Sequence, residues 1–185
     1  AEPKLDGLAV ELVYENGYFK YGSTRGDGIS GEDITHNLKT IKAIPLSINS
    51  QTPPKLLEIR GEVFINHNDF KKLNKEQVKQ NKNIFANPRN CAAGSLRQLN
   101  PNVAKSRPLR IFCYAPGQID GFEFLTQKDF LDQIKKWGFP VNHNIKVGKG
   151  VSFLKEYYQS AESLRQSLDY DIDGVVFKIN SYNLQ

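Results

Sequence analysis

Lys4 and Asp6 stand two residues apart near the start of the chain, in Lys4-Leu5-Asp6-Gly7. A lysine amine is a nucleophile in its neutral form, and a nearby carboxylate can orient it. Taken alone, the same two residues also fit a surface ion pair. The cluster therefore needs support from elsewhere in the sequence.

Two further clusters combine carboxylates with cations on expected strands. Asp173-Gly174 precedes an apolar run that ends at Lys178, which is unusual because Asp and Gly are poor strand formers. A lysine that protects an edge strand from aggregation is the simpler interpretation. In residues 57–63, alternation places Glu58, Arg60 and Glu62 on one strand face. Such a carboxylate can hold ribose hydroxyls or simply pair with the arginine.

A fourth cluster, residues 86–99, is rich in small side chains and carries Arg89 and Arg97. Eight residues apart, these arginines lie near one face of an unbroken helix. Small residues allow close backbone approach, and guanidinium groups suit phosphate oxygens. The alternative is a tightly packed helix with solvated arginines.

The elements that must position these clusters follow from periodicity and turn signals. Alternation predicts a strand at residues 8–14, and Asn16-Gly17 indicates a type I′ hairpin to a strand at 18–24. Further strands are expected at 56–65, 109–114 and 172–179. Helices are expected around 34–41, after Asn66 or Asn68, and from the N-cap Thr126 to 137. Residues 152–168 are expected to form one amphipathic helix or a pair of short helices. This irregular order favours an α+β fold with a largely antiparallel sheet.

Composition limits the class of protein. The chain has 185 residues, with 25 Lys and Arg against 20 Asp and Glu, so its formal net charge is +5. The length favours one domain with a real core, and 39% hydrophobic residues argue against disorder. No apolar run is long enough for a membrane span. Cys91 and Cys113 are too few for a disulfide framework or a Cys-rich zinc site, which favours a reducing cytoplasm; we interpret both as packing residues.

Considered together, the clusters resemble the nucleotidyltransferase motifs of bacterial NAD⁺-dependent DNA ligases. The matching segments are residues 2–7, 23–28, 60–63, 87–98, 112–114 and 173–178. Lys-x-Asp-Gly belongs to a wider superfamily with ATP-dependent ligases and mRNA-capping enzymes, whereas residues 24–28 and 87–98 are more specific to the NAD⁺-dependent branch. The resemblance covers nearly the whole chain. It implies a nucleotidyltransferase, ATP-grasp-like DNA-ligase adenylation fold.

By this resemblance Lys4 attacks the α-phosphorus of NAD⁺, expels nicotinamide mononucleotide and becomes AMP-lysine. The AMP then passes to the 5′-phosphate of a DNA nick, and the 3′-hydroxyl displaces it. A free lysine has a pKa near 10.4, so only about one in a thousand is neutral at pH 7.4. A bound Mg²⁺, Arg25 or Lys178 would favour the neutral amine. Asp6 either orients Lys4 or helps to hold the metal.

The resemblance also assigns contacts to the nucleotide. Glu2 matches the residue on the adenine amino group, Glu62 the carboxylate on the ribose hydroxyls, and Tyr114 the aromatic residue stacked on adenine. The remaining nucleotide-binding residues are Leu5, Arg25 and Lys178. The arginines that match contacts to the AMP phosphate or the nicked DNA are Arg89, Arg97 and Arg165.

The implied cofactors are NAD⁺ as the AMP donor and Mg²⁺ or Mn²⁺, with Asp6 and Glu62 as candidate metal ligands. The implied partner of the full-length enzyme is nicked double-stranded DNA at the bacterial nucleoid in the cytoplasm, with no membrane. We expect residues 1–185 to be the adenylation core alone. Outside it we expect an N-terminal segment that binds nicotinamide mononucleotide. We also expect, on the C-terminal side, a final lysine motif and the OB-fold, zinc-finger, helix-hairpin-helix and BRCT regions. Zinc is expected only in this C-terminal part.

Such a fragment is expected to be monomeric, to bind adenosine-type small molecules, to bind NAD⁺ poorly, to self-adenylate slowly if at all and not to seal nicks. One alternative is an ATP-dependent ligase or capping-type enzyme, which the choice of AMP donor in the longer protein would distinguish. Another is a non-catalytic nucleic-acid-binding module, which would act through exposed lysines and depend on salt. Those lysines are Lys71, Lys72, Lys75, Lys79 and Lys82. A solvated helix face explains them in either case.

Overall fold

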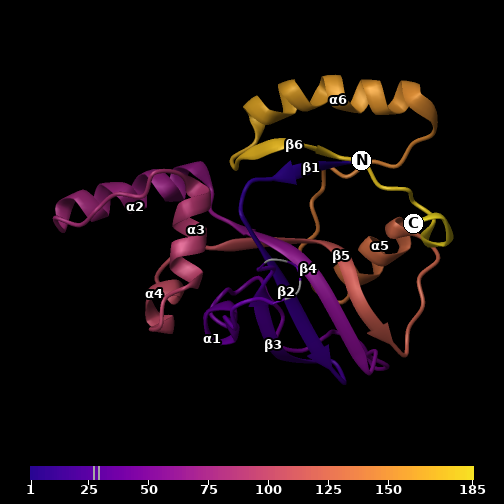
Figure 1. Cartoon of the computed structure of the whole chain (residues 1–185), viewed down its shortest axis with the longest axis horizontal. Helices are drawn as coiled ribbons and strands as arrows, with labels where there is room; N and C mark the ends of the chain where they lie inside the picture. The colour runs from indigo at the N-terminus through magenta and orange to yellow at the C-terminus, as the bar shows by residue number, and fades with distance from the viewer. Residues whose placement is uncertain (27, 29) are drawn as a thin grey trace.

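Two antiparallel sheets organise the chain (Figure 1). The computed structural model describes residues 1–26, 28 and 30–185. The larger sheet has the strand order β3-β2-β4-β5, and the smaller sheet joins β1 to β6. Every strand pair formed by the described residues is antiparallel. The mixed architecture expected from the sequence, with antiparallel sheets and several helices, is confirmed.

The element bounds agree with the sequence periodicity over most of the chain. The strands are β1 Glu2–Leu5, β2 Leu8–Glu15, β3 Tyr18–Thr24, β4 Leu56–Phe64, β5 Arg110–Asp120 and β6 Ile172–Val176. The helices are α1 Thr35–Leu38, α2 His67–Lys79, α3 Pro88–Leu96, α4 Pro101–Lys105, α5 Gln127–Lys136 and α6 Gly150–Ser167, followed by a 3₁₀ turn at Tyr182–Leu184. Among the described residues, no helix is long and apolar enough to cross a membrane.

Local signals explain where several elements begin and turn. Asn16 and Gly17 adopt φ values of 49° and 83°, as the predicted type I′ hairpin requires of both central residues. Thr126 caps α5 by accepting the Asp129 N–H at 3.1 Å. Asn66 occupies the N-cap position of α2, but its side chain donates to Asp169 instead of capping the helix.

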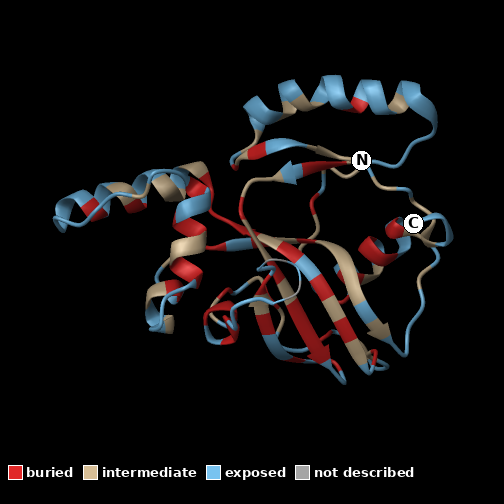
Figure 2. Ribbon diagram, viewed as in Figure 1, coloured by how far each residue is buried: buried red, intermediate tan, exposed pale blue. Residues whose placement is uncertain are grey.

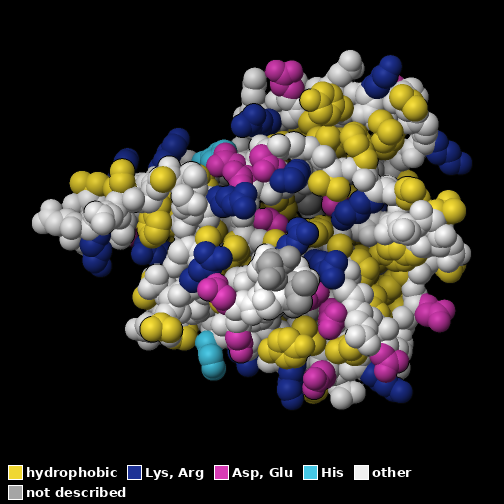
Figure 3. Space-filling model, viewed as in Figure 1, with side chains coloured by type: hydrophobic (Ala, Val, Ile, Leu, Met, Phe, Trp, Pro, Cys, Tyr) yellow, Lys and Arg dark blue, Asp and Glu magenta, His cyan; other side chains and the backbone are white. Residues whose placement is uncertain are grey.

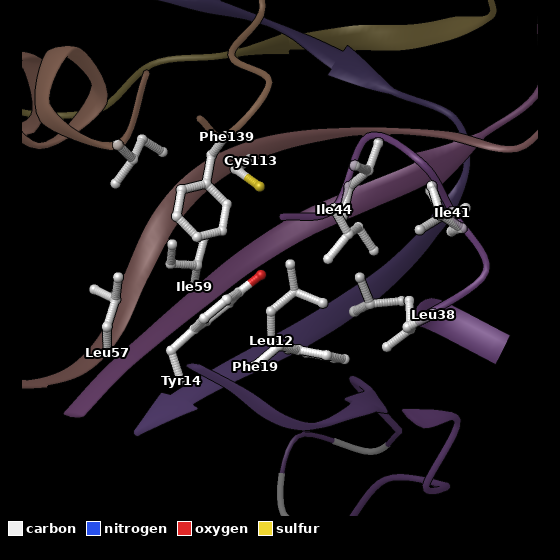
Figure 4. Packing of buried hydrophobic residues seen from close by; sticks show 14 of the residues in the cluster. Leu12, Tyr14, Phe19, Leu38, Ile41, Ile44, Leu57, Ile59, Cys113 and Phe139 are labelled. Atoms are coloured by element: carbon white, nitrogen blue, oxygen red, sulfur yellow. The ribbon is translucent and has the colours of Figure 1, made fainter. Parts of the chain in front are cut away.

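The main core lies against one face of the larger sheet (Figures 2 and 4). Leu12, Tyr14 and Ile59 are almost fully buried there, whereas Glu62 on the opposite β4 face is only partly buried. The Tyr14 hydroxyl donates to the Pro45 carbonyl at 2.7 Å, which ties the segment after α1 to β2. The period-two alternation of β2 and β4 thus leaves their polar face free for a site.

Four features differ from the sequence expectation. Strand β1 was not predicted, because it exists only by pairing with β6 far along the chain. Strand β5 continues beyond residue 114 to Asp120, and Pro116 is tolerated because β5 is an edge strand. Strand β6 ends at Val176 rather than at residue 179. The short helix α4 was also missed.

Candidate functional site

A cavity of about 510 Å³ lies where the smaller sheet meets the polar face of the larger one. Charged side chains of both signs surround the centre of the face in Figure 3. Nine residues singled out from the sequence line this cavity: Glu2, Lys4, Leu5, Arg25, Glu62, Arg89, Arg97, Tyr114 and Lys178. Residues up to 176 positions apart in sequence therefore meet at one place.

Lys4 is presented by β1 opposite Gly174 of β6. Its Nζ lies 2.8 and 2.9 Å from the two carboxylate oxygens of Asp173, and about half of the side chain is exposed. Sequence analysis flagged the Asp173-Gly174 pair but did not join it to Lys4. The antiparallel pairing of β1 with β6 makes that connection.

Glu2, Lys178 and Tyr114 form a second set of contacts in the cavity. The Glu2 carboxylate lies 2.6 Å from Lys178 Nζ, and this ion pair is well shielded from solvent. Lys178 Nζ also donates to the Tyr114 carbonyl at 2.9 Å and lies 5.0 Å from the centroid of the Tyr114 ring. The lysine thus fixes β1 against β5 with an aromatic ring beside it.

Burial raises the pKa of two groups in the cavity. Desolvation raises the pKa of Glu62 to about 7, assisted by nearby Asp173 and opposed by Arg89, the Gly7 N–H and Lys4. Glu62 can therefore exchange a proton near neutral pH. Desolvation, with a contribution from Glu62, also raises the pKa of Tyr114 to about 12, which keeps its hydroxyl neutral.

Helix α3 brings both predicted arginines to the cavity. Asn87 caps the helix by accepting the Asn90 N–H at 2.7 Å, and Pro88 occupies the first turn. Arg89 Nη1 donates to Asp6 Oδ1 at 3.1 Å, and Arg97 Nε lies 2.8 Å from Glu32 Oε2. Asp6 does not line the cavity itself but holds one of its arginines. Glu32 was not predicted, since only the fold brings it to Arg97.

The remaining predicted residues lie elsewhere. Arg165 is exposed in the last turn of α6 and is not among the residues that line the cavity. The lysines of the alternative nucleic-acid interpretation are exposed along and just after α2, outside the same lining: Lys71, Lys72, Lys75, Lys79 and Lys82. Asp27 of the 23–28 motif lies outside the described residues. Both cysteines are buried and unpaired, as expected of packing residues.

Within residues 1–26, 28 and 30–185, no three His, Cys, Asp or Glu side chains converge as a metal site. Asp6 and Glu62 are the candidate metal ligands from the sequence, and Arg89 lies close to both. Its guanidinium group donates a hydrogen bond to Asp6 and electrostatically opposes the rise in the pKa of Glu62 that burial causes. Both carboxylates are therefore near the same cavity. Mg²⁺ commonly takes one or two protein carboxylates and completes its shell with substrate phosphates and water. The carboxylates present fit that mode of binding.

Comparison with known proteins matches the entire chain, residues 1–185, to the family model described as NAD-dependent DNA ligase adenylation domain. Curated proteins named DNA ligase are similar: 53% identity over 184 residues for Geobacter sulfurreducens, 55% over 184 for Geotalea uraniireducens and 51% over 180 for Ectopseudomonas mendocina. These alignments cover 97–100% of this chain but only 23–28% of the relatives. The chain spans about a quarter of the length of the curated relatives it matches.

Proposed function

Since the chain belongs to the family of NAD-dependent DNA ligase adenylation domains, we propose that its cavity binds the AMP half of NAD⁺ and that Lys4 accepts the AMP. The observation that carries this proposal is the convergence of β1, β4, β5, α3 and the end of β6 on one cavity that contains Lys4. The fold proposed for residues 1–185 is accordingly the nucleotidyltransferase fold of DNA-ligase adenylation domains.

The adenosine end of the cavity has a suitable chemical composition. The Tyr114 ring offers a flat surface for the base. The Glu2 carboxylate, held by Lys178, is an acceptor for the adenine amino group. When ionised, Glu62 can accept hydrogen bonds from both ribose hydroxyls. Leu5 adds an apolar surface beside Lys4.

The reaction begins when the Lys4 ammonium transfers a proton to Asp173, and the neutral Nζ then turns away from that carboxyl group. The Nζ lone pair then attacks the α-phosphorus, the P–N bond forms, and the bond from phosphorus to the leaving phosphate oxygen of nicotinamide mononucleotide breaks. Nζ gives up its second proton to the departing phosphate or to solvent. Asp173, which accepts both hydrogen bonds from Nζ, is positioned to receive the proton. Arg25, Arg89 and Arg97 stabilise the charge that develops on the phosphate oxygens.

We propose Mg²⁺ as the metal, held by Asp6 or Glu62 together with phosphate oxygens. When bound, it would supply charge stabilisation at the transferred phosphate. Zinc is proposed only for parts of the relatives beyond this chain. Arg165, on α6, is assigned to the DNA rather than to the AMP because it lies outside the cavity lining.

In the longer protein, the AMP would pass to the 5′-phosphate of nicked double-stranded DNA during replication and repair, in the bacterial cytoplasm. Residues 1–185 are proposed to be the adenylation core, with the segments for nicotinamide mononucleotide and for encircling DNA located in the other three quarters of the relatives. The isolated chain is expected to be a monomer that binds adenosine but does not seal nicks.

Calorimetric titration of the chain with adenosine tests the proposed pocket. Tyr114→Ala removes the aromatic surface and is expected to weaken binding by roughly ten- to a hundredfold, the effect of losing one stacked base. Tyr158→Ala is the matched control, because Tyr158 is 66% exposed on α6. Equal affinities of the two variants would contradict the assignment of the cavity to adenosine.

A further inference from the structure

Arg97 is held at the cavity from two directions. It is the C-cap residue of α3, where the helical backbone ends, and its exposed side chain has several rotatable bonds. For Arg97 to contact a phosphate from this position, other residues must fix both the backbone of Arg97 and its guanidinium group. The residues that place it come from one segment of the chain, residues 32–37, which lies beside the end of α3.

Asn37 fixes the backbone on both sides of the arginine. Its buried Nδ2 donates to the Leu96 carbonyl at 2.6 Å and to the Gln98 carbonyl at 2.8 Å. These are the carbonyls directly before and after Arg97. No described residue makes a hydrogen bond to the buried Asn37 Oδ1, and such an orphaned atom is costly. Asparagine is therefore favoured here by its two donated hydrogen bonds rather than by apolar packing.

Glu32 acts on the guanidinium group. Its carboxylate lies 2.8 Å from Arg97 Nε, and both side chains are more than half exposed. The Glu32 backbone is anchored to Thr24 at the cavity by two hydrogen bonds of 3.0 Å. The carboxylate thus occupies one donor that a phosphate oxygen would need. It holds the arginine ready but also competes with the phosphate.

We infer that Asn37 and Glu32 are positioning residues for Arg97 with opposite effects on phosphate binding. Asn37 strengthens phosphate binding because it fixes the arginine backbone in every state. Glu32 weakens phosphate binding because its ion pair with Arg97 must open first. The inference rests on the proposed role of Arg97 toward a phosphate monoester, which is either that of AMP or the 5′-phosphate of a nick.

Two affinity ratios isolate the phosphate contribution and distinguish its source: AMP against adenosine, and a nicked duplex with a 5′-phosphate against one with a 5′-hydroxyl. Arg97→Ala is expected to lower at least one ratio by roughly ten- to a hundredfold, the effect of losing a charge-assisted hydrogen bond. Asn37→Ala should lower the same ratio by roughly three- to thirtyfold, and Glu32→Gln should raise it by about two- to fivefold.

A double-mutant cycle separates positioning from a general effect on the fold. In the Arg97→Ala background, Asn37→Ala and Glu32→Gln should leave the ratio unchanged. Thr35→Ala is the matched control for Asn37, because Thr35 is also buried in this segment but its side chain hydrogen-bonds Gly22 and Asp33 rather than the residues that flank Arg97. It should lower the thermal midpoint without changing the ratio. Glu15→Gln, an exposed partner of Lys20, is the control for Glu32.

The failures can be told apart. If Arg97→Ala changes neither ratio, the proposed phosphate role of Arg97 is wrong and the inference falls with it. Two results would overturn only the positioning role of Asn37. In the first, Arg97→Ala lowers a ratio but Asn37→Ala does not. In the second, Asn37→Ala lowers the ratio by the same factor whether or not Arg97 is present. If the Glu32→Gln ratio is equal to or below that of the unmodified chain, Glu32 does not compete with the phosphate for Arg97. If Asn37→Ala does not fold, Asn37→Ser, which keeps one donor, takes its place in the cycle.

Discussion

Glu62 links single-residue chemistry in the cavity to pH. Its pKa is raised to about 7 by burial, so the carboxylate becomes ionised as the pH rises through neutrality. The ionised form has no O–H of its own, and both of its oxygens accept hydrogen bonds more strongly than those of the neutral carboxyl group. We therefore expect the affinity for adenosine to increase between about pH 6 and pH 8 and to be flat for Glu62→Gln. Titration calorimetry across this range measures it, and an identical pH profile in the variant would contradict the ribose assignment.

The same raised pKa predicts a change in stability. Between the usual carboxyl value of 4.5 and about 7, the folded chain binds more protons at Glu62 than the unfolded chain does. The free energy of unfolding contributed by this group therefore falls as the pH rises through that window. Relative to Glu62→Gln, the unmodified chain should lose roughly 1–3 kcal/mol between pH 4.5 and pH 7.5. Urea unfolding at several pH values measures the difference.

Removing the Glu2 carboxylate tests the shielded ion pair with Lys178. Glu2→Ala leaves the lysine partly buried beside Tyr114 without its carboxylate, because the side chains of Lys178 and Glu2 are only 24% and 10% exposed. We expect a loss of roughly 2–4 kcal/mol in the free energy of unfolding. Glu15→Ala breaks the exposed pair with Lys20 and should cost less than about 1 kcal/mol. Equal losses in the two variants would show that burial of the first pair has no energetic consequence.

At the scale of elements, Gly7 explains why the turn after β1 needs a glycine. A Cβ at this position would lie 2.3 Å from the Val63 carbonyl oxygen of β4 and 2.9 Å from Glu62 Cγ. Gly7→Ala should therefore displace β4 and cost roughly 1–3 kcal/mol or more. In α3, Gly94→Ala meets only Phe85 Cε1 at 3.7 Å and should stabilise the helix by about 0.5–1 kcal/mol. Thermal unfolding compares the two, and the same sign for both would contradict this packing.

Elements whose signals are local could be predicted from the sequence. The strands β2 and β3, their Asn16-Gly17 turn and the Thr126 cap all follow from neighbouring residues. Strand β1 could not be predicted, because Glu-Pro-Lys-Leu has no alternating pattern and becomes a strand only against β6. The small residues of α3 were expected to permit close approach, and that holds for buried Ala92 but not for Gly94, which has space around it.

The candidate site divides in the same way. The order and spacing of the motifs were enough to predict which residues belong to the site, and nine of the predicted residues line one cavity. The ion pairs of the site could not be predicted from the sequence. Lys4 meets Asp173, and Arg97 meets Glu32, only because the tertiary structure brings distant segments together.

At the scale of the whole molecule, the net charge of +5 bears on how nicked DNA would be held. Each phosphate contact made by a cation releases counterions, so log affinity falls with log salt concentration by about 0.9 per contact. Arg165→Ala, which removes the arginine assigned to the DNA, should reduce that slope by about 0.9 in fluorescence anisotropy titrations with a nicked duplex. Lys20→Ala, at the far hairpin beside Glu15, should leave the slope unchanged. A slope that does not respond to Arg165→Ala would remove this arginine from the proposed DNA contact.

We propose that the cavity between the two sheets holds an adenosine nucleotide with its phosphate at Lys4. A crystal structure of the chain with bound AMP tests it most directly. We expect adenine against the Tyr114 ring, the ribose at Glu62, and the phosphorus beside Lys4 Nζ, with the ion pair to Asp173 opened. AMP bound outside this cavity, or bound within it with the phosphate directed away from Lys4, would contradict the account.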